Sequence, residues 1–203
     1  FPVGIARSVV EARANPSPLT EPRVEPIHRD EWSDEVQTLL DPGGTGGSVL
    51  NLYATLAHHP RLFRPRAVQS AYIRIDSTLS DRAREILILR IGWLCGSEYE
   101  WSQHVRAARR VGMNDEEIRR VAIGVTADGW DPLSQLLIRA VDELHADSNL
   151  SDTTWALLSE YYSTAELIDV VITVAGYRMV SVALNSIGTQ LEPDRQRFPD
   201  LRR

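Results

Sequence analysis

Apolar residues recur along most of the chain at intervals of three and four positions, which is the spacing of one face of an α-helix. The run DRAREILILRIGWLC at 81–95 is apolar on nearly every side in its middle, so it predicts a central buried helix. No stretch shows convincing alternation of apolar and polar residues between hairpin turns. The pattern therefore predicts an all-α fold.

The residues that start and stop helices divide this pattern into segments. Asn114 with Glu117 and Ser163 with Glu166 have the spacing of capping boxes, and Asp131 before a proline is a third start signal. The expected helices are 31–40, 49–60 (ended by Pro60), 61–75, 81–95, 97–111, 114–124, 132–146, 151–162 and 163 to about 187.

The chain divides into an arm and one domain. Residues 1–30 are rich in proline and predict an irregular N-terminal arm, of a kind that often wraps its own domain or a neighbouring subunit. Residues 31–203 are expected to form a single all-helical domain, since 203 residues suit one domain with an added arm. The glycine-rich loop 41–48 lacks a preceding strand and a GK[ST] ending, so we interpret it as a flexible connector.

Composition narrows the class of protein. A formal net charge of −6 argues against a nucleic-acid binder. Cys95 is the single cysteine, so an intrachain disulfide and a thiolate zinc site are excluded and a cytoplasmic location is expected. The longest apolar stretch, 167–184, is interrupted by Asp169 and Arg178, and it predicts a buried helix rather than a membrane span.

The stretch SEYEWSQH at 97–104 carries the candidate chemistry. On a helix, Ser97, Glu100 and His104 share one face with Trp101 alongside, whereas Tyr99 lies nearly opposite. A carboxylate four residues before an imidazole raises the pKa of that imidazole, and the pair is then a usable proton donor and acceptor. The simpler alternatives are an exposed ion pair, an N-cap at Ser97 and a core position for Trp101.

The segment 79–121, LSDRAREILILRIGWLCGSEYEWSQHVRAARRVGMNDEEIRRV, resembles the carboxymuconolactone decarboxylase family of the alkyl hydroperoxidase D-like superfamily. The similarity extends to 59–65, to 131–155 and to the last helix through 185–193. Redox members of that superfamily carry a glutamate, then a C-x-x-C pair, then a histidine. The resemblance places Glu85 at the glutamate, Ser97 and Glu100 at the two cysteines, and His104 at the histidine. Because both cysteines are missing and Cys95 is two positions early, dithiol peroxidase activity is disfavoured.

The resemblance implies an alkyl hydroperoxidase D-like helical bundle with a cofactor-independent acid/base site. It implies His104, Glu100 and Glu85 as catalytic residues and Ser97, Tyr99 and Trp101 as substrate-binding residues, with no metal and no cofactor. The substrate would be a small carboxylated lactone or a related carbonyl compound, acted on by decarboxylation. Lactone opening, isomerisation or cyclisation would use the same residues. Arg90, Arg106 and Arg178 are candidates to compensate the two carboxylates.

Three other functions stay open from the sequence. A metal site would combine Glu85, Glu100 and His104 with His58 or His59. A non-catalytic binding or assembly protein would keep the fold alone. Peroxidase activity through Cys95 between subunits is the third. The resemblance also implies a homo-oligomer, either a dimer, a trimer or a hexamer, and we expect a small-molecule substrate with neither nucleic acid nor membrane as a partner.

Overall fold

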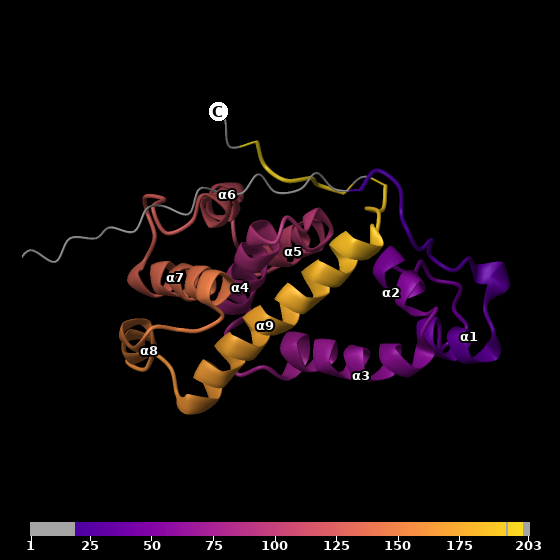
Figure 1. Ribbon diagram of the computed structural model, residues 1–203, viewed down its shortest axis with the longest axis horizontal. Helices are drawn as coiled ribbons and strands as arrows, with labels where there is room; N and C mark the ends of the chain where they lie inside the picture. Colours follow the sequence, from indigo (N-terminus) through magenta and orange to yellow (C-terminus); the bar gives the residue numbers. More distant parts are fainter. Residues whose placement is uncertain (1–18, 194, 201–203) are drawn as a thin grey trace, which may run out of the picture.

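The computed structural model describes residues 19–193 and 195–200. All of the regular structure in these residues is helical, which confirms the all-α prediction. Helices α1 to α3 lie on one side of the long diagonal helix α9, and α6 to α8 lie on the other side (Figure 1). The first eighteen residues of the expected arm lie outside the described residues.

The helices follow one another without any strand between them in the described part of the chain. In order they are η1 (Arg29–Glu31), α1 (Asp34–Leu40), α2 (Asn51–Leu56), α3 (Pro60–Ala71), the π-helical turn η2 (Tyr72–Asp76), α4 (Asp81–Leu94), α5 (Glu98–Arg110), α6 (Asp115–Ile123), α7 (Pro132–Asp147), α8 (Asp152–Leu158) and α9 (Thr164–Ile187).

Helix α4 is the centre of the fold. It packs against α5, α6, α7 and α9, and each of its residues from 83 to 92 is buried. This burial on every side explains why the segment has no polar face in the sequence. It also encloses three charged side chains, Arg84, Glu85 and Arg90, each of which needs a partner inside the protein.

Helix starts are where the sequence reasoning succeeds best. The capping boxes of Asn114 with Glu117 and of Ser163 with Glu166 are both formed, and Asp131 caps α7. Two C-terminal boundary predictions are wrong: α8 ends at Leu158 and not at 162, and α2 ends at Leu56, where Pro60 is the first residue of α3 instead of the end of the preceding helix. Proline fits there because the first N–H of a helix has no intrahelical partner.

The described part of the arm, from residue 19 onward, runs along its own domain. The Arg23 amide donates to Ile187 O at 2.7 Å, and the Ile27 amide donates to Ala54 O at 3.3 Å. The loop 41–48 is more ordered than a flexible connector, because the Asp41 carboxylate accepts hydrogen bonds from two backbone amides of the loop and from the Arg29 guanidinium. These contacts hold the pKa of Asp41 well below its usual range.

Helix α9 is long and apolar enough to cross a membrane by length and composition, and half of its most apolar window is buried inside the protein. Its Asp169 is buried and accepts hydrogen bonds from the Tyr72 hydroxyl, the Ser77 hydroxyl and the backbone and side chain of Thr78. Asp169 therefore fixes the π-helical turn against α9.

Candidate functional site

A tight turn between α4 and α5 brings the predicted acid/base residues together. Gly96 has a φ of 63°, a conformation that favours glycine, and it reverses the chain between the two helices. The first turn of α5 then lies within van der Waals distance of α4 at Gly92. Glu85 on α4 consequently faces Glu100 and His104 on α5.

The three side chains converge in the interior. Glu85 Oε2 lies 2.7 Å from His104 Nδ1, and Glu100 Oε2 lies 3.6 Å from His104 Nε2. The exposed fractions of Glu85, Glu100 and His104 are 2%, 4% and 8%. The interpretation of an exposed i, i+4 ion pair is therefore wrong, and the imidazole is held between two carboxyl groups.

Burial and nearby charges have opposing effects on the pKa values of His104 and Glu100. Burial lowers the pKa of His104, but the Glu85 charge, its hydrogen bond and the Glu100 charge outweigh burial, so the pKa of His104 is raised above its ordinary value of 6.5. Burial raises the pKa of Glu100, and the nearby charges of His104 and Arg66 only partly offset this. The arrangement favours a protonated imidazole beside Glu85, with Glu100 inclined to the neutral acid.

The arginines near the site differ from those expected. Arg84 Nε lies 3.6 Å from Glu85 Oε1, and the charge of Arg66 on α3 acts on Glu100. The three arginines proposed from sequence lie elsewhere. Arg90 binds Asp142 and two carbonyls of α6, Arg106 is exposed on α5, and Arg178 binds Leu144 O and Ser148.

Tyr177 on α9 is a site residue that sequence reasoning missed. Its ring lies edge-on to the His104 ring, with centroids 4.9 Å apart and planes at 89°. Burial raises the pKa of Tyr177, and the charges of Glu100 and Glu85 raise it further, so its hydroxyl stays protonated. No hydrogen bond of that hydroxyl is found within residues 19–193 and 195–200. Because 73 positions separate the two residues, only the fold reveals the contact.

Residues 64–143, which include the whole Glu85–Glu100–His104 group, match the model of the carboxymuconolactone decarboxylase family. Three solved structures share the fold over most of both chains. One is an uncharacterized peroxidase-related protein with an alkylhydroperoxidase AhpD core from Ralstonia eutropha JMP134 (19% identity, TM-score 0.73, 85% of this chain and 93% of that chain). Another is an uncharacterized peroxidase-related protein from Silicibacter sp. TM1040 (13% identity, TM-score 0.75, 88% of this chain and 95% of that chain).

The third is the debrominase Bmp8 in complex with 2,3,4-tribromopyrrole (15% identity, TM-score 0.69, 86% of this chain and 94% of that chain). No curated protein matches this chain in sequence. Residues 64–143 are similar to the carboxymuconolactone decarboxylase family, and the described chain shares the fold of AhpD-like proteins. The three structural likenesses establish the fold alone.

The structure places the three residues predicted to bind substrate, Ser97, Tyr99 and Trp101, in different surroundings. Ser97 occupies the N-cap position of α5, but its fully buried hydroxyl forms no capping hydrogen bond and has no partner in the described residues. Trp101 is fully buried and packs against Trp93 and Phe198, which makes it a core residue. Tyr99 points away from His104 and donates to Glu192 at 2.6 Å.

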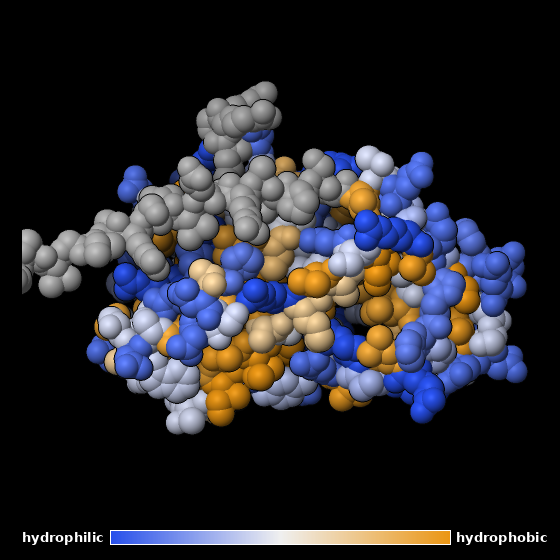
Figure 2. Space-filling view, in the orientation of Figure 1, coloured by the Kyte–Doolittle hydropathy of each residue, from blue (hydrophilic) through white to orange (hydrophobic). Residues whose placement is uncertain are grey.

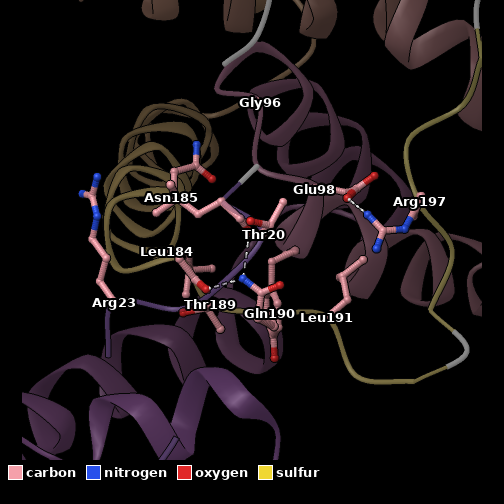
Figure 3. Close-up of a pocket in the computed structure, with 13 residues that line it drawn as sticks. Thr20, Arg23, Gly96, Glu98, Leu184, Asn185, Thr189, Gln190, Leu191 and Arg197 are labelled. Carbon is pink, nitrogen blue, oxygen red and sulfur yellow. Dashed lines mark hydrogen bonds and ion pairs between the residues drawn. The ribbon is translucent and has the colours of Figure 1, made fainter. Parts of the chain in front are cut away.

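Tyr99 instead lines a separate hollow of about 510 Å³. Figure 3 shows residues of its walls. Its walls come from the described arm, the end of α9 and the start of α5, and the Glu98–Arg197 ion pair of 2.8 Å lies at its edge. Neither His104 nor its two carboxyl partners line this hollow. The pocket and the acid/base group are therefore distinct places in the fold.

The structure gives no support to peroxidase activity through Cys95 or to a metal site that includes Glu85, Glu100 and His104. Burial raises the pKa of the Cys95 thiol to about 11, so it is not a thiolate near neutral pH. His58 contacts Glu25 O and His59 caps α3, so neither histidine joins Glu85, Glu100 and His104. Among residues 19–193 and 195–200, no group of three or more His, Cys, Asp or Glu side chains is arranged to hold a metal ion.

Proposed function

We propose that this protein is a cofactor-independent acid/base enzyme that acts on a small carboxylated lactone or a related carbonyl compound. The observation that carries the proposal is the buried imidazole of His104, which lies 2.7 Å from Glu85 and 3.6 Å from Glu100. A carboxylate at Nδ1 orients the ring and stabilises its charged form, as general acid–base catalysis requires. A cytoplasmic location fits an enzyme with one cysteine and no intrachain disulfide.

The proposed reaction is a decarboxylation followed by protonation. The bond between the ring and the substrate carboxylate breaks, CO2 leaves, and the electron pair moves into the conjugated lactone carbonyl as a dienolate. The imidazolium of His104 then gives its proton to carbon, and the neutral imidazole regains a proton from water. Glu85 holds the charged ring throughout, so the protein supplies orientation and electrostatic stabilisation without a bound group of its own.

The charges at the site are compatible with an anionic substrate. The imidazolium of His104 balances the charge of Glu85, and burial raises the pKa of Glu100, which reduces the negative charge that Glu100 contributes. No carboxylate pairs with Arg66 in the described part of the chain, where its guanidinium instead donates to the Gln69 side chain. Arg66 is therefore available to bind a substrate carboxylate, and this removes the repulsion expected from two acidic residues.

Tyr177→Phe is expected to lower kcat by about 10- to 100-fold, because we propose that the hydroxyl of this ring, which packs on the His104 ring, donates a hydrogen bond to the developing dienolate oxygen. The substitution keeps the ring that packs on His104, so folding is preserved. Steady-state kinetics at several pH values measures this effect. An unchanged kcat with an unchanged pH profile would show that Tyr177 only packs against the imidazole.

The proposed function is tested by incubating the purified protein in D2O with carboxymuconolactone and with the same ring lacking the carboxylate. We expect CO2 release and one deuterium on the product carbon from the first compound, detected by mass spectrometry. Exchange without CO2 loss from either compound would indicate an isomerase-type proton transfer at the same group. The variant Cys95→Ser is the control and should retain full activity, because the thiol lies outside the group. Cysteine-dependent peroxide reduction without any exchange contradicts the proposal.

A further inference from the structure

The outward face of α9 carries an unusual row of apolar side chains. Figure 2 shows hydrophobic residues gathered over the first half of this helix. The exposed residues of the row are Ile168 (53%), Ile172 (41%), Ala175, Met179 (47%) and Val182 (56%). They follow one another at intervals of 4, 3, 4 and 3 positions, which is the spacing of the contact positions in paired helices.

The same face has no charge. Along 167–187 the charged residues are Asp169, which is buried, and Arg178, which is half-buried and bound to Leu144 O. Every exposed residue in this part of α9 is uncharged. A surface helix of a monomeric protein ordinarily carries charged residues on its solvent side, so this face has the composition of a contact surface.

We propose that α9 of a second copy of this chain packs antiparallel against this row, about a two-fold axis at Ala175. The row reads almost the same in both directions from Ala175. With the helices antiparallel, Ile168 lies opposite Val182, and Ile172 lies within one residue, about 1.5 Å along the axis, of the position opposite Met179, so each large side chain meets another. Ala175 meets its own counterpart, and its small side chain lets the helices approach closely at the axis. A two-fold contact requires a self-complementary surface of this kind.

The available area fits a dimer core. Each of the four large residues keeps roughly half its surface exposed, on the order of 80 Å² apiece, so the row contributes roughly 300 Å² per copy. The π-helical turn lies against the first half of α9 through the Tyr72–Asp169 hydrogen bond, and it adds Tyr72 (41% exposed) and Ile75 (74% exposed). A standard interface needs about 800 Å² per partner, so this apolar core leaves room for the usual polar rim.

Charge favours a second copy over a lipid surface. A helix that lies on a membrane ordinarily carries lysine or arginine beside its apolar face. The exposed part of α9 has none, and the chain has a net charge of −6, which opposes binding to anionic lipid. The opposite half of α9 packs in its own core and cannot insert without unfolding the domain.

The first test is the mass in solution, measured by light scattering and sedimentation. Wild-type protein is expected at twice its chain mass of 22.8 kDa, or at a multiple of that dimer. Ile172→Glu is expected to weaken association by about 100-fold or more, because it buries an unpaired charge in each half of the contact. Ile123→Glu on α6 (38% exposed) is the matched control and should leave the mass unchanged. Circular dichroism checks that both variants stay folded.

The second test fixes the axis by disulfide cross-linking in the Cys95→Ser background. Ala175→Cys is expected to form an intermolecular disulfide under mild oxidation. Ile168→Cys is not, because antiparallel helices would separate the two copies of residue 168 by about 21 Å along the axis. A parallel pairing would cross-link both variants and would overturn the proposal.

A monomer or a trimer as the wild-type species overturns the proposal. So does an assembly whose mass is unchanged by Ile172→Glu. Co-flotation of wild-type protein with vesicles of phosphatidylcholine and phosphatidylglycerol, lost in the same variant and accompanied by a monomeric mass, would assign the face to lipid instead. None of these measurements depends on catalytic activity, so the proposal stands or falls apart from the proposed function.

Discussion

His104→Gln is expected to lower kcat/KM for the decarboxylation or exchange reaction by about 10² to 10⁴-fold, the range that a positioned general acid contributes. Glutamine can still donate a hydrogen bond to Glu85, which lies 2.7 Å from Nδ1 in the wild type, so the interior stays satisfied. It cannot carry and release the proton. Steady-state kinetics, with circular dichroism for the fold, measures the result.

His145→Gln is the matched control, because this histidine lies beside Cys95 and contacts neither Glu85 nor Glu100. We expect its activity to be near that of the wild type. Equal activity of His104→Gln and the wild type would contradict the acid/base proposal, whatever the behaviour of Tyr177→Phe.

The pH dependence has a defined sign. The pKa of His104 is raised in the folded protein, so its contribution to stability is fully present below 6.5 and is lost as pH rises through the folded pKa. If the imidazolium is the proton donor, activity also falls as the pH rises through the pKa of His104 in the folded protein. The His104→Gln protein should lack this decline in the free energy of unfolding, measured by urea titration at several pH values.

Arg90→Met is expected to lower the free energy of unfolding by about 3–5 kcal/mol, the usual cost of removing one partner of a buried charged network. The Arg90 guanidinium contacts Asp142 at 2.6 Å and donates to the carbonyls of Val121 and Ala122 at 3.0 and 2.9 Å. Methionine fills a similar volume but leaves both carbonyls of α6 without this donor. Urea unfolding followed by circular dichroism gives the change.

Arg64→Met provides the comparison for this stability effect. Arg64 pairs with Glu35 at 3.3 Å, and both side chains are more than half exposed, so its loss is expected to cost less than about 1 kcal/mol. A similar small cost for Arg90→Met would show that water reaches the guanidinium site and that Arg90 does not hold α4, α6 and α7 together.

Arg90 also shows why the sequence gives only part of the site. Helix periodicity and caps predict the helices closely, because those signals are local: Asn114, Asp131 and Ser163 all start the helices that they are expected to start. The pairing of Glu85 with His104 comes from the family resemblance, and Glu100 with His104 follows from helix spacing. Assigning Arg90 to the site is wrong because an arginine on a helix buried on all sides can turn toward any neighbour.

Tyr177 and Arg66 are near the site in the structure, although no local pattern in the sequence indicates this. Tyr177 packs on the His104 ring and the charge of Arg66 acts on Glu100, each from another helix, and neither residue stands in a motif. Tyr99 was expected at the site although helix geometry places it nearly opposite His104, and that geometry holds in the structure. Spacing within one helix was therefore a better guide to the site than residue type.

The group formed by Glu85, Glu100 and His104 contains only oxygen and nitrogen donors, and the single thiol of the chain, Cys95, is half-buried and stays protonated. Nothing in this centre can be converted to a sulfenic acid or capped by glutathione. The proposed reaction should therefore be unaffected by oxidants that would inactivate an enzyme with a catalytic dithiol, and its rate should depend on pH and not on the redox potential of the medium.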